Sequence, residues 1–220
     1  MLAARLVILP GASDMLSRHT ALVVIDAQRA FVDREGSLVR TFGIDEAQPG
    51  LAALDRLRQF VAEHRSIGPT IFVRSEYRPG QFTNGDLNHG MAYVCVPGEN
   101  IDCEWATGVD ISPHDVVVTK HHADAATSPA FRSAIEQAIE DGAAQIVVAG
   151  FQLTTCVVAS ALSTFEMVRA RGVRVTVVEA LTGSRASSHV PDASGVSRVE
   201  ATRRALETAG VEVILDVRGD

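Results

Sequence analysis

The feature of this sequence that most restricts its fold is a series of short, unbroken apolar runs rich in β-branched residues. A strand with one face in water alternates apolar and polar residues, and these runs do not alternate. They therefore predict strands buried on both faces, as in a parallel sheet. The runs are residues 21–25, 70–73, 116–118, 146–149, 173–178 and 211–215.

Between these runs, apolar residues recur at the spacing of an α-helix. One stripe follows Pro49-Gly50, a second follows Ser128-Pro129, and two more cover residues 157–168 and 199–206. Alternating strands and helices predict an α/β fold, a three-layer α/β/α sandwich around a Rossmann-like, mostly parallel six-stranded sheet. Right-handed crossovers place the carboxyl ends of all parallel strands on one edge, where such sheets bind ligands.

Length and charge narrow the classes of protein further. The chain has 220 residues, and we expect one domain over residues 1–220. Its net charge of −7 argues against a nucleic-acid partner, because binding to phosphates requires clustered Lys and Arg. No apolar stretch approaches the ~20 residues that span a bilayer, so no membrane partner is expected.

The cysteines and the N-terminus indicate the compartment. Cys95, Cys103 and Cys156 are too few and too scattered for a disulfide framework or a tetrahedral zinc site. The apolar run within residues 1–10 is too short for the core of a signal peptide. We therefore expect a cytoplasmic protein whose thiols are reduced and available for chemistry.

One long segment, residues 76–110, interrupts the alternation. It contains six acidic residues against one basic residue, both tyrosines and the only tryptophan. A long loop without regular structure is usually functional. We expect an acidic, aromatic lid that favours a cationic substrate, with Glu76, Tyr77 and Trp105 contacting it. A solvated loop and a contact between subunits are the alternatives.

Three chemically useful residues lie close to the ends of predicted strands. Asp26 follows the first strand, Lys120 the third, and Cys156 the fourth. Each alone has a structural explanation: a helix cap, a solvated strand end, or a buried structural cysteine. Together they supply a nucleophile, a base that takes its proton, and a cation that stabilises the negative charges of the carboxylate and the thiolate. A thiol in the first turn of a helix, capped here by Thr154 or Thr155, is expected to tend toward thiolate.

The order and spacing of these motifs resemble the isochorismatase-like cysteine hydrolase superfamily. The matching positions are Asp26, Gln28 and Phe31, then Lys120, then Gly150, Cys156 and Val157. The resemblance implies a catalytic triad of Asp26, Lys120 and Cys156. It also implies a cis peptide at Phe151–Gln152 and an oxyanion hole formed by the backbone N–H groups of Gln152 and Cys156. Gln28, Phe31, Asp124 and Phe151 are expected to contact the substrate.

Departures from the family pattern refine the expected function. Ser75-Glu76-Tyr77 stands where nicotinamidase-type members carry a metal-binding Asp-x-His, so no metal and no cofactor are expected. His121 and His122 are interpreted as loop residues. Ala126 stands where members often have Phe, which predicts a roomier pocket. Members that cleave isochorismate tend to lack the cysteine, so Cys156 favours hydrolysis of a C–N bond.

The expected function is cysteine-dependent hydrolysis of an amide, carbamoyl, ureide or lactam C–N bond through a thioester. The resemblance is to the branch that includes N-carbamoylsarcosine amidohydrolase and nicotinamidase. A narrower hypothesis is a streptothricin-like lactam hydrolase acting on a cationic substrate. The alternatives are an isochorismatase-type vinyl-ether hydrolase using Asp26 alone and a non-catalytic binding protein. The expected partners are a small-molecule substrate and further copies of the chain, in a dimer or tetramer.

Overall fold

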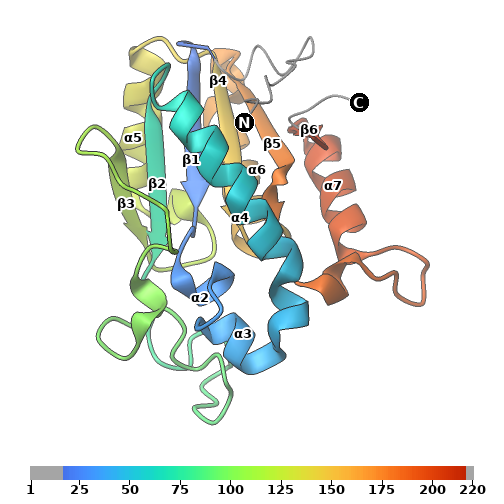
Figure 1. The fold of residues 1–220 in the computed structure, drawn as a ribbon. Helices are drawn as coiled ribbons and strands as arrows, with labels where there is room; N and C mark the ends of the chain where they lie inside the picture. Colours follow the sequence, from blue (N-terminus) through green and yellow to red (C-terminus); the bar gives the residue numbers. More distant parts are fainter. Residues whose placement is uncertain (1–16, 217–220) are drawn as a thin grey trace, which may run out of the picture.

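The computed structural model describes residues 17–216, which form a single six-stranded sheet with helices on both faces (Figure 1). The sheet order is β3-β2-β1-β4-β5-β6, and every neighbouring pair is parallel. This confirms the predicted α/β sandwich. The strands are β1 (Thr20–Ile25), β2 (Thr70–Ser75), β3 (Val116–Lys120), β4 (Gln145–Phe151), β5 (Arg174–Gly183) and β6 (Glu212–Ile214). The N-terminal segment considered for a signal peptide lies outside the described residues.

The helices form the two outer layers. The long helix α4 crosses one face of the sheet, and α2 and α3 lie at its lower end near the carboxyl edge (Figure 1). The α-helices are α2 (Arg29–Val32), α3 (Ser37–Phe42), α4 (Ile44–His64), α5 (Pro129–Glu140), α6 (Val158–Val168) and α7 (Arg198–Ala209). Shorter 3₁₀ turns are η1 (Ile101–Cys103), η2 (Ala125–Thr127), η4 (Arg169–Arg171) and η5 (Ala186–His189). No helix within residues 17–216 is both long and apolar enough to cross a membrane.

Each face of the sheet has its own apolar core, which explains the unbroken runs in the sequence. Along β1, Leu22 and Val24 pack on the α4 side, whereas Val23 and Ile25 pack on the opposite side. The second core includes residues of α5, α6 and α7. Successive side chains of a strand point to opposite faces of the sheet. Because both faces are covered, neighbouring positions along the strand are both apolar.

Two local expectations differ from the structure. Strand β3 is an edge strand, and Val116 and Val117 are exposed rather than buried. Helix α4 begins at Ile44, so Pro49 lies inside it and does not mark its start. Asp45 and Glu46 occupy its first turn, where carboxylates interact favourably with the helix dipole.

Candidate active site

The carboxyl ends of three neighbouring strands bring the key side chains together. Asp26 directly follows β1, Ser75 ends β2, and Lys120 ends β3. Ser75 and Lys120 are register partners across the parallel pair, so their side chains leave the sheet in the same direction. All three residues are fully buried. The order of the strands therefore creates a polar cluster at an otherwise apolar edge.

An ion pair forms the centre of this cluster. Lys120 Nζ lies 2.9 Å from Asp26 Oδ2. It also donates to Ser75 Oγ at 2.8 Å, to Tyr77 OH at 3.0 Å and to the carbonyl of His122 at 3.0 Å. Burial is the largest single influence and lowers the pKa of Lys120, but the charges of Asp26 and Cys156 and the hydrogen bonds with them together outweigh it, so the pKa is raised overall. The ammonium therefore stays charged although it has no contact with water.

Ser75 and Tyr77 connect the ion pair to the thiol. Ser75 Oγ lies 2.8 Å from Asp26 Oδ1 and 2.5 Å from Tyr77 OH. Tyr77 OH lies 3.8 Å from Cys156 Sγ. Burial raises the pKa of the Tyr77 phenol, so the phenol remains neutral and keeps a proton to donate. A thiolate formed at Cys156 would have this donor beside it.

The structure corrects the expected ionisation of Cys156. Burial raises its pKa to about 12, and the neighbouring Asp26 charge adds to this effect. Lys120 and the hydrogen bond with Tyr77 act in the opposite direction but do not outweigh burial. The resting group is therefore a neutral thiol, because burial destabilises the thiolate more than the charge of Lys120 stabilises it. A base must remove its proton before it can act as a nucleophile.

The backbone before Cys156 is irregular. Cys156 lies in a π-helical turn, η3 (Leu153–Val157), between β4 and α6. The peptide bond Phe151–Gln152 is cis, as the family resemblance implied. The predicted capping by Thr154 or Thr155 is wrong, because Gln152 is the N-cap and no side chain caps the turn. The carbonyl of Gln152 instead accepts from Thr155 N and Val157 N, each at 3.1 Å.

Gly150 allows β4 to reach this turn. Its φ is +113°, and a Cβ at this position would lie 2.0 Å from the carbonyl oxygen of Ile25. Any other residue would push β4 away from the end of β1, and with it Cys156 from Asp26.

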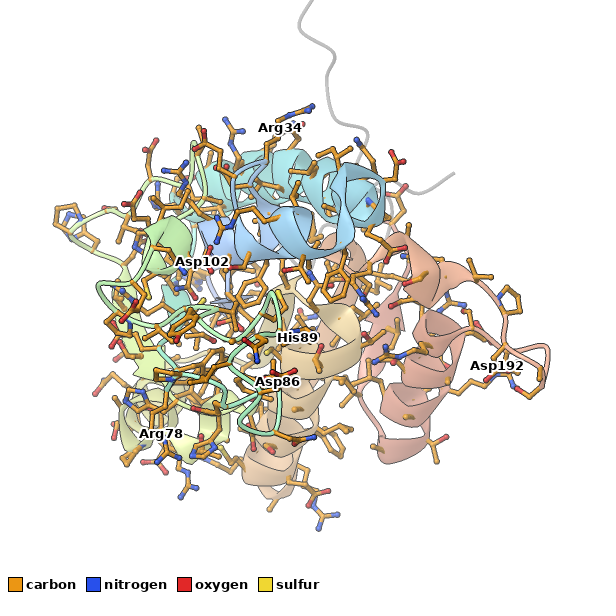
Figure 2. The ribbon with its side chains drawn as sticks, turned by 90° about the horizontal axis from the view of Figure 1, so that it is seen from below. Arg34, Arg78, Asp86, His89, Asp102 and Asp192 are labelled. Atoms are coloured by element: carbon orange, nitrogen blue, oxygen red, sulfur yellow. The ribbon has the colours of Figure 1, made fainter. Side chains whose placement is uncertain are left out.

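Cys156 opens into a cavity of about 360 Å³ at this edge. The turn lines one part of the cavity, and the 76–110 segment contributes aromatic and apolar side chains to another. The remaining lining comes mainly from α2, α3 and the segments after β5. The lining residues are Phe31, Leu38, Phe42, Tyr77, Phe82, His89, Met91, Val94, Ala123, Gln152, Thr154, Thr155, Cys156, Arg185, Ser188 and Arg198. Figure 2, viewed from below, shows His89 near the middle, with Arg78 and Asp192 farther out.

Four of the expected site residues, Phe31, Tyr77, Gln152 and Cys156, line this cavity. Two others lie behind it rather than in it. Gln28 is fully buried, accepts from Ser75 N at 2.6 Å and donates to Ser75 O at 3.0 Å. Phe151 is fully buried in the core on the α4 side. These two residues support the site and do not face a ligand.

Glu76 and Trp105 also lie away from the cavity. Glu76 forms an ion pair with Arg74 at 3.0 Å and borders a different cavity, beside His121 and His122. Trp105 packs edge-on against Phe72, with ring centroids 5.6 Å apart. Neither is placed to contact a substrate at Cys156.

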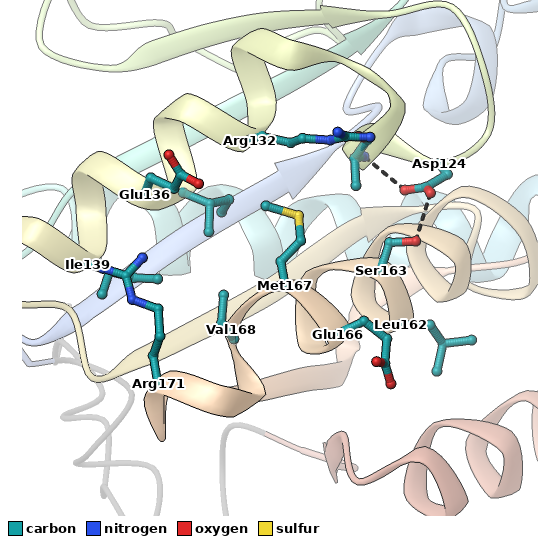
Figure 3. Close-up of a pocket in the computed structure, with 12 residues that line it drawn as sticks. Asp124, Arg132, Glu136, Ile139, Leu162, Ser163, Glu166, Met167, Val168 and Arg171 are labelled. Carbon is teal, nitrogen blue, oxygen red and sulfur yellow. Dashed lines mark hydrogen bonds between the residues drawn. The ribbon is translucent and has the colours of Figure 1, made fainter.

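Asp124 faces a separate cavity of about 430 Å³ between α5 and α6 (Figure 3). Its carboxylate accepts from Ala126 N at 2.8 Å and from Ser163 Oγ at 2.7 Å. Asp124 therefore fixes the start of η2 rather than the substrate. The small residue Ala126 lines this other cavity, so its size does not widen the cavity at Cys156.

Two acidic residues of the 76–110 segment, Asp102 and Glu104, attach it to α3 and α2. Asp102 is fully buried and accepts from Ser37 N at 3.0 Å, from the Ser37 hydroxyl and from Arg40 Nη2 at 3.3 Å. Glu104 pairs with Arg29 at 3.1 Å. No acidic residue of the segment lines the cavity at Cys156, so the basis for expecting a cationic substrate is removed.

The sequence reasoning missed several residues of the site. Ser75 was considered only as part of an absent metal motif, although its position at a strand end was a usable signal. Arg185 lies two residues after the end of β5, so its position after a strand was a similar signal. Arg198, Phe42 and Phe82 had no such signal, because only folding brings α3, α7 and the 76–110 segment to one cavity.

The side chains at the position of the family's metal motif are Ser75 and Tyr77, and both bind within the Asp26–Lys120 cluster. Within residues 17–216, no group of three or more His, Cys, Asp or Glu residues could hold a metal ion. That the protein requires no metal stays a prediction, which chelation tests.

The fold and the site define an α/β protein in which an acid, a lysine and a thiol meet at the carboxyl edge of a parallel sheet. The chain belongs to the isochorismatase family, a family of hydrolases: the family model described as an isochorismatase domain matches residues 20–214. A search of curated proteins gave no match.

Solved structures share the fold at low sequence identity. Pyrazinamidase from Pyrococcus horikoshii in complex with zinc superposes with a TM-score of 0.67 at 14% identity, covering 90% of this chain and 99% of that chain. PnC1 from L. infantum in complex with nicotinate gives a TM-score of 0.65 at 20% identity, covering 90% and 92%. An isochorismatase family protein from Desulfovibrio vulgaris gives 0.64 at 16% identity, covering 90% and 94%.

Proposed function

We propose that the protein hydrolyses a C–N bond in a small amide-like molecule through a thioester on Cys156. The observation that carries this proposal is the position of Cys156, between a ligand-sized cavity and the buried Asp26–Lys120 pair. A thiol nucleophile requires a partner that takes its proton and later returns it to the leaving nitrogen. Asp26 is the carboxylate placed to do both.

The first half of the reaction forms the thioester. Asp26 takes the thiol proton, and Cys156 Sγ attacks the carbonyl carbon of the substrate. The backbone N–H groups of Gln152 and Cys156 are our candidates for holding the negative oxygen of the tetrahedral intermediate. When the C–N bond breaks, the proton on Asp26 moves to the nitrogen, which leaves as ammonia or an amine.

The second half returns the enzyme to its resting state. Asp26 takes a proton from water, and the hydroxide formed attacks the thioester carbon. The C–S bond breaks, and the sulfur regains the proton from Asp26 while the acid product leaves. Lys120 forms the ion pair with Asp26 that balances its charge between proton transfers, and the Tyr77 hydroxyl stabilises the transient thiolate.

The names of two relatives of the same fold support amide hydrolysis. One of them is a pyrazinamidase, and another is a complex with nicotinate, which is a carboxylate. A vinyl-ether hydrolase would need Asp26 as an acid but would have no role for Cys156. A binding protein would need neither residue.

The test is a screen for release of ammonia and amines over amides, carbamoyl compounds, ureides and lactams. We expect Cys156→Ala to abolish turnover while the melting temperature stays close to that of the parent, since the replacement leaves little cavity. Mass spectrometry of the parent with a slow substrate should find the acyl group on Cys156. Full activity in Cys156→Ala would contradict the thioester mechanism, and turnover of a vinyl ether alone would favour the alternative hydrolase.

A further inference from the structure

We propose that the substrate of this site carries a carboxylate, which binds Arg185 and Arg198 while its amide group lies at Cys156. This inference rests on the proposed function, because it names the substrate class of the same cavity. Arg185 follows β5, and Arg198 is the first residue of α7. Both line the cavity into which Cys156 opens.

The charges around the cavity favour an anion. Arg185 and Arg198 line it, and no Asp or Glu of the described chain does. The nearest carboxylate of the catalytic cluster, Asp26, is fully buried and neutralised by Lys120. A concave surface lined by one sign of charge and apolar walls concentrates ligands of the opposite charge. The cavity is therefore suited to the opposite charge from the one that the acidic segment suggested.

The guanidinium group of Arg185 is held in place but still has free hydrogen-bond donors within the described residues. Its guanidinium carbon lies 4.3 Å from the centroid of the Phe42 ring, which holds the plane of the group. Its Nε forms an ion pair with Glu46 Oε2 at 3.8 Å, a separation too long for a hydrogen bond, so Glu46 balances part of the charge and leaves the Nη donors open. Glu46 is already bound to Ser187 Oγ at 2.6 Å. The two Nη groups have no partner within residues 17–216, so both can meet the two oxygens of a carboxylate.

Arg198 differs from the other arginines of α7. Arg203 pairs with Glu179 at 3.0 Å, and Arg204 pairs with Glu200 at 2.9 Å. Arg198 forms no ion pair in the described part of the chain, although it is the one of the three that lines the cavity. An exposed arginine contributes less to binding than a half-buried one, so Arg185 should be the stronger anchor.

His89 supplies a further donor. Met91 N donates to His89 Nδ1 at 3.0 Å, so a neutral His89 carries its proton on Nε2. His89 lines the same cavity. The three basic residues that line the cavity, Arg185, Arg198 and His89, therefore all offer hydrogen-bond donors, as a carboxylate requires.

The test that needs no known substrate compares two alkylating reagents on Cys156. Iodoacetate is an anion, and iodoacetamide is its neutral counterpart of nearly equal size. The rate ratio of the two reagents is measured at Cys156 by peptide mass spectrometry, with free glutathione as the reference thiol. We expect a higher ratio in the protein than in glutathione, and a fall with added salt.

Variants connect the ratio to the two arginines. We expect it to fall about tenfold in Arg185→Gln, the loss typical of one charge-assisted hydrogen bond, and less in Arg198→Gln. Arg185→Lys should keep part of the preference, because lysine keeps the positive charge. The rest should be lost, because lysine lacks the paired N–H donors of the guanidinium group. Arg204→Gln removes a charge from the same helix outside the cavity and serves as the matched control. An unchanged ratio in Arg185→Gln, or an equal fall in Arg204→Gln, would overturn the proposal.

A second experiment measures hydrolysis, and it separates the proposal of a carboxylate site from the proposal of amide hydrolysis. For any amide that is turned over, the free acid and its methyl ester are compared. A higher kcat/KM for the acid that Arg185→Gln reduces supports the carboxylate site, and equal values overturn it while the amidase stands. An iodoacetate preference that depends on Arg185, with no amide hydrolysed, would support the anion site and contradict the proposed reaction. Stronger protection of Cys156 by a phosphate or sulfonate than by a carboxylate of similar size would overturn the choice of anion.

Discussion

The hydroxyl of Tyr77 lies 3.8 Å from Sγ of Cys156, on the side chain of a loop residue that is fixed by Lys120. The 76–110 segment thus contributes a hydroxyl next to the thiol as well as walls of the cavity. It places a neutral hydroxyl beside the thiol, whereas none of its carboxylates lines the cavity at Cys156.

Replacing Tyr77 with Phe tests this donor. We expect kcat/KM to fall about tenfold, since a thiolate loses a hydrogen bond and charge-assisted bonds are the stronger ones. Tyr93→Phe is the matched control, because Tyr93 belongs to the same segment and does not line the cavity. If Tyr77→Phe lowers only the melting temperature and leaves kcat/KM unchanged, the role of Tyr77 is structural.

Removing the charge of Lys120 should lower the stability of the fold. Lys120→Met leaves Asp26 as an unpaired buried carboxylate, which costs about 3–5 kcal/mol of the free energy of unfolding. The double variant Asp26→Asn/Lys120→Met removes both charges and should recover much of that loss. Denaturant unfolding measures both. A double variant no more stable than Lys120→Met would mean that the ion pair is not the source of the loss.

The raised pKa of Cys156 predicts an unusual pH profile for alkylation. With a pKa of about 12, the thiolate fraction of the resting protein should rise about tenfold per pH unit through pH 9 and 10. An ordinary cysteine, with a pKa near 8.5, levels off in this range. Iodoacetamide rates at Cys156, followed by peptide mapping to separate Cys95 and Cys103, measure the profile. A plateau below pH 8 would show that the thiol is ionised at rest.

Asp102 should anchor the 76–110 segment to α3. Asp102→Ala leaves the buried N–H of Ser37 without its acceptor, which we expect to cost about 1–3 kcal/mol of the free energy of unfolding. Protease cleavage within 76–110 should also become faster, since local opening exposes the backbone. Glu99→Ala, in the same segment, is the control. Equal cleavage of both variants would contradict the anchoring role.

The activity should not depend on a metal ion. Ser75 and Tyr77 occupy the position of the family's metal motif, and a hydroxyl and a phenol are poor substitutes for a carboxylate and an imidazole. Treatment with a chelator should leave turnover unchanged, and metal analysis of the purified protein should find less than one equivalent. Stoichiometric zinc with activity lost on chelation would contradict this prediction.

The sequence by itself determined the class of fold and the central cluster. Unbroken apolar runs are typical of strands covered on both faces, so they predicted a parallel sheet without knowledge of any contact, although the run in the edge strand β3 is partly exposed. Parallel strands joined by right-handed crossovers have their carboxyl ends on one edge. For this reason Asp26, Lys120 and Cys156 could be assigned to one site from their positions after strands.

Only the tertiary structure decided which other residues face the ligand and how the thiol is ionised. The charge of Glu76, Asp102 and Glu104 is plain in the sequence, but the direction of each side chain depends on partners far away in the chain. Arg185 and Arg198 reach the cavity because β5 ends and α7 begins beside it. The pKa of Cys156 depends on burial by several distant segments, and burial is a property of the packed molecule that no local pattern encodes.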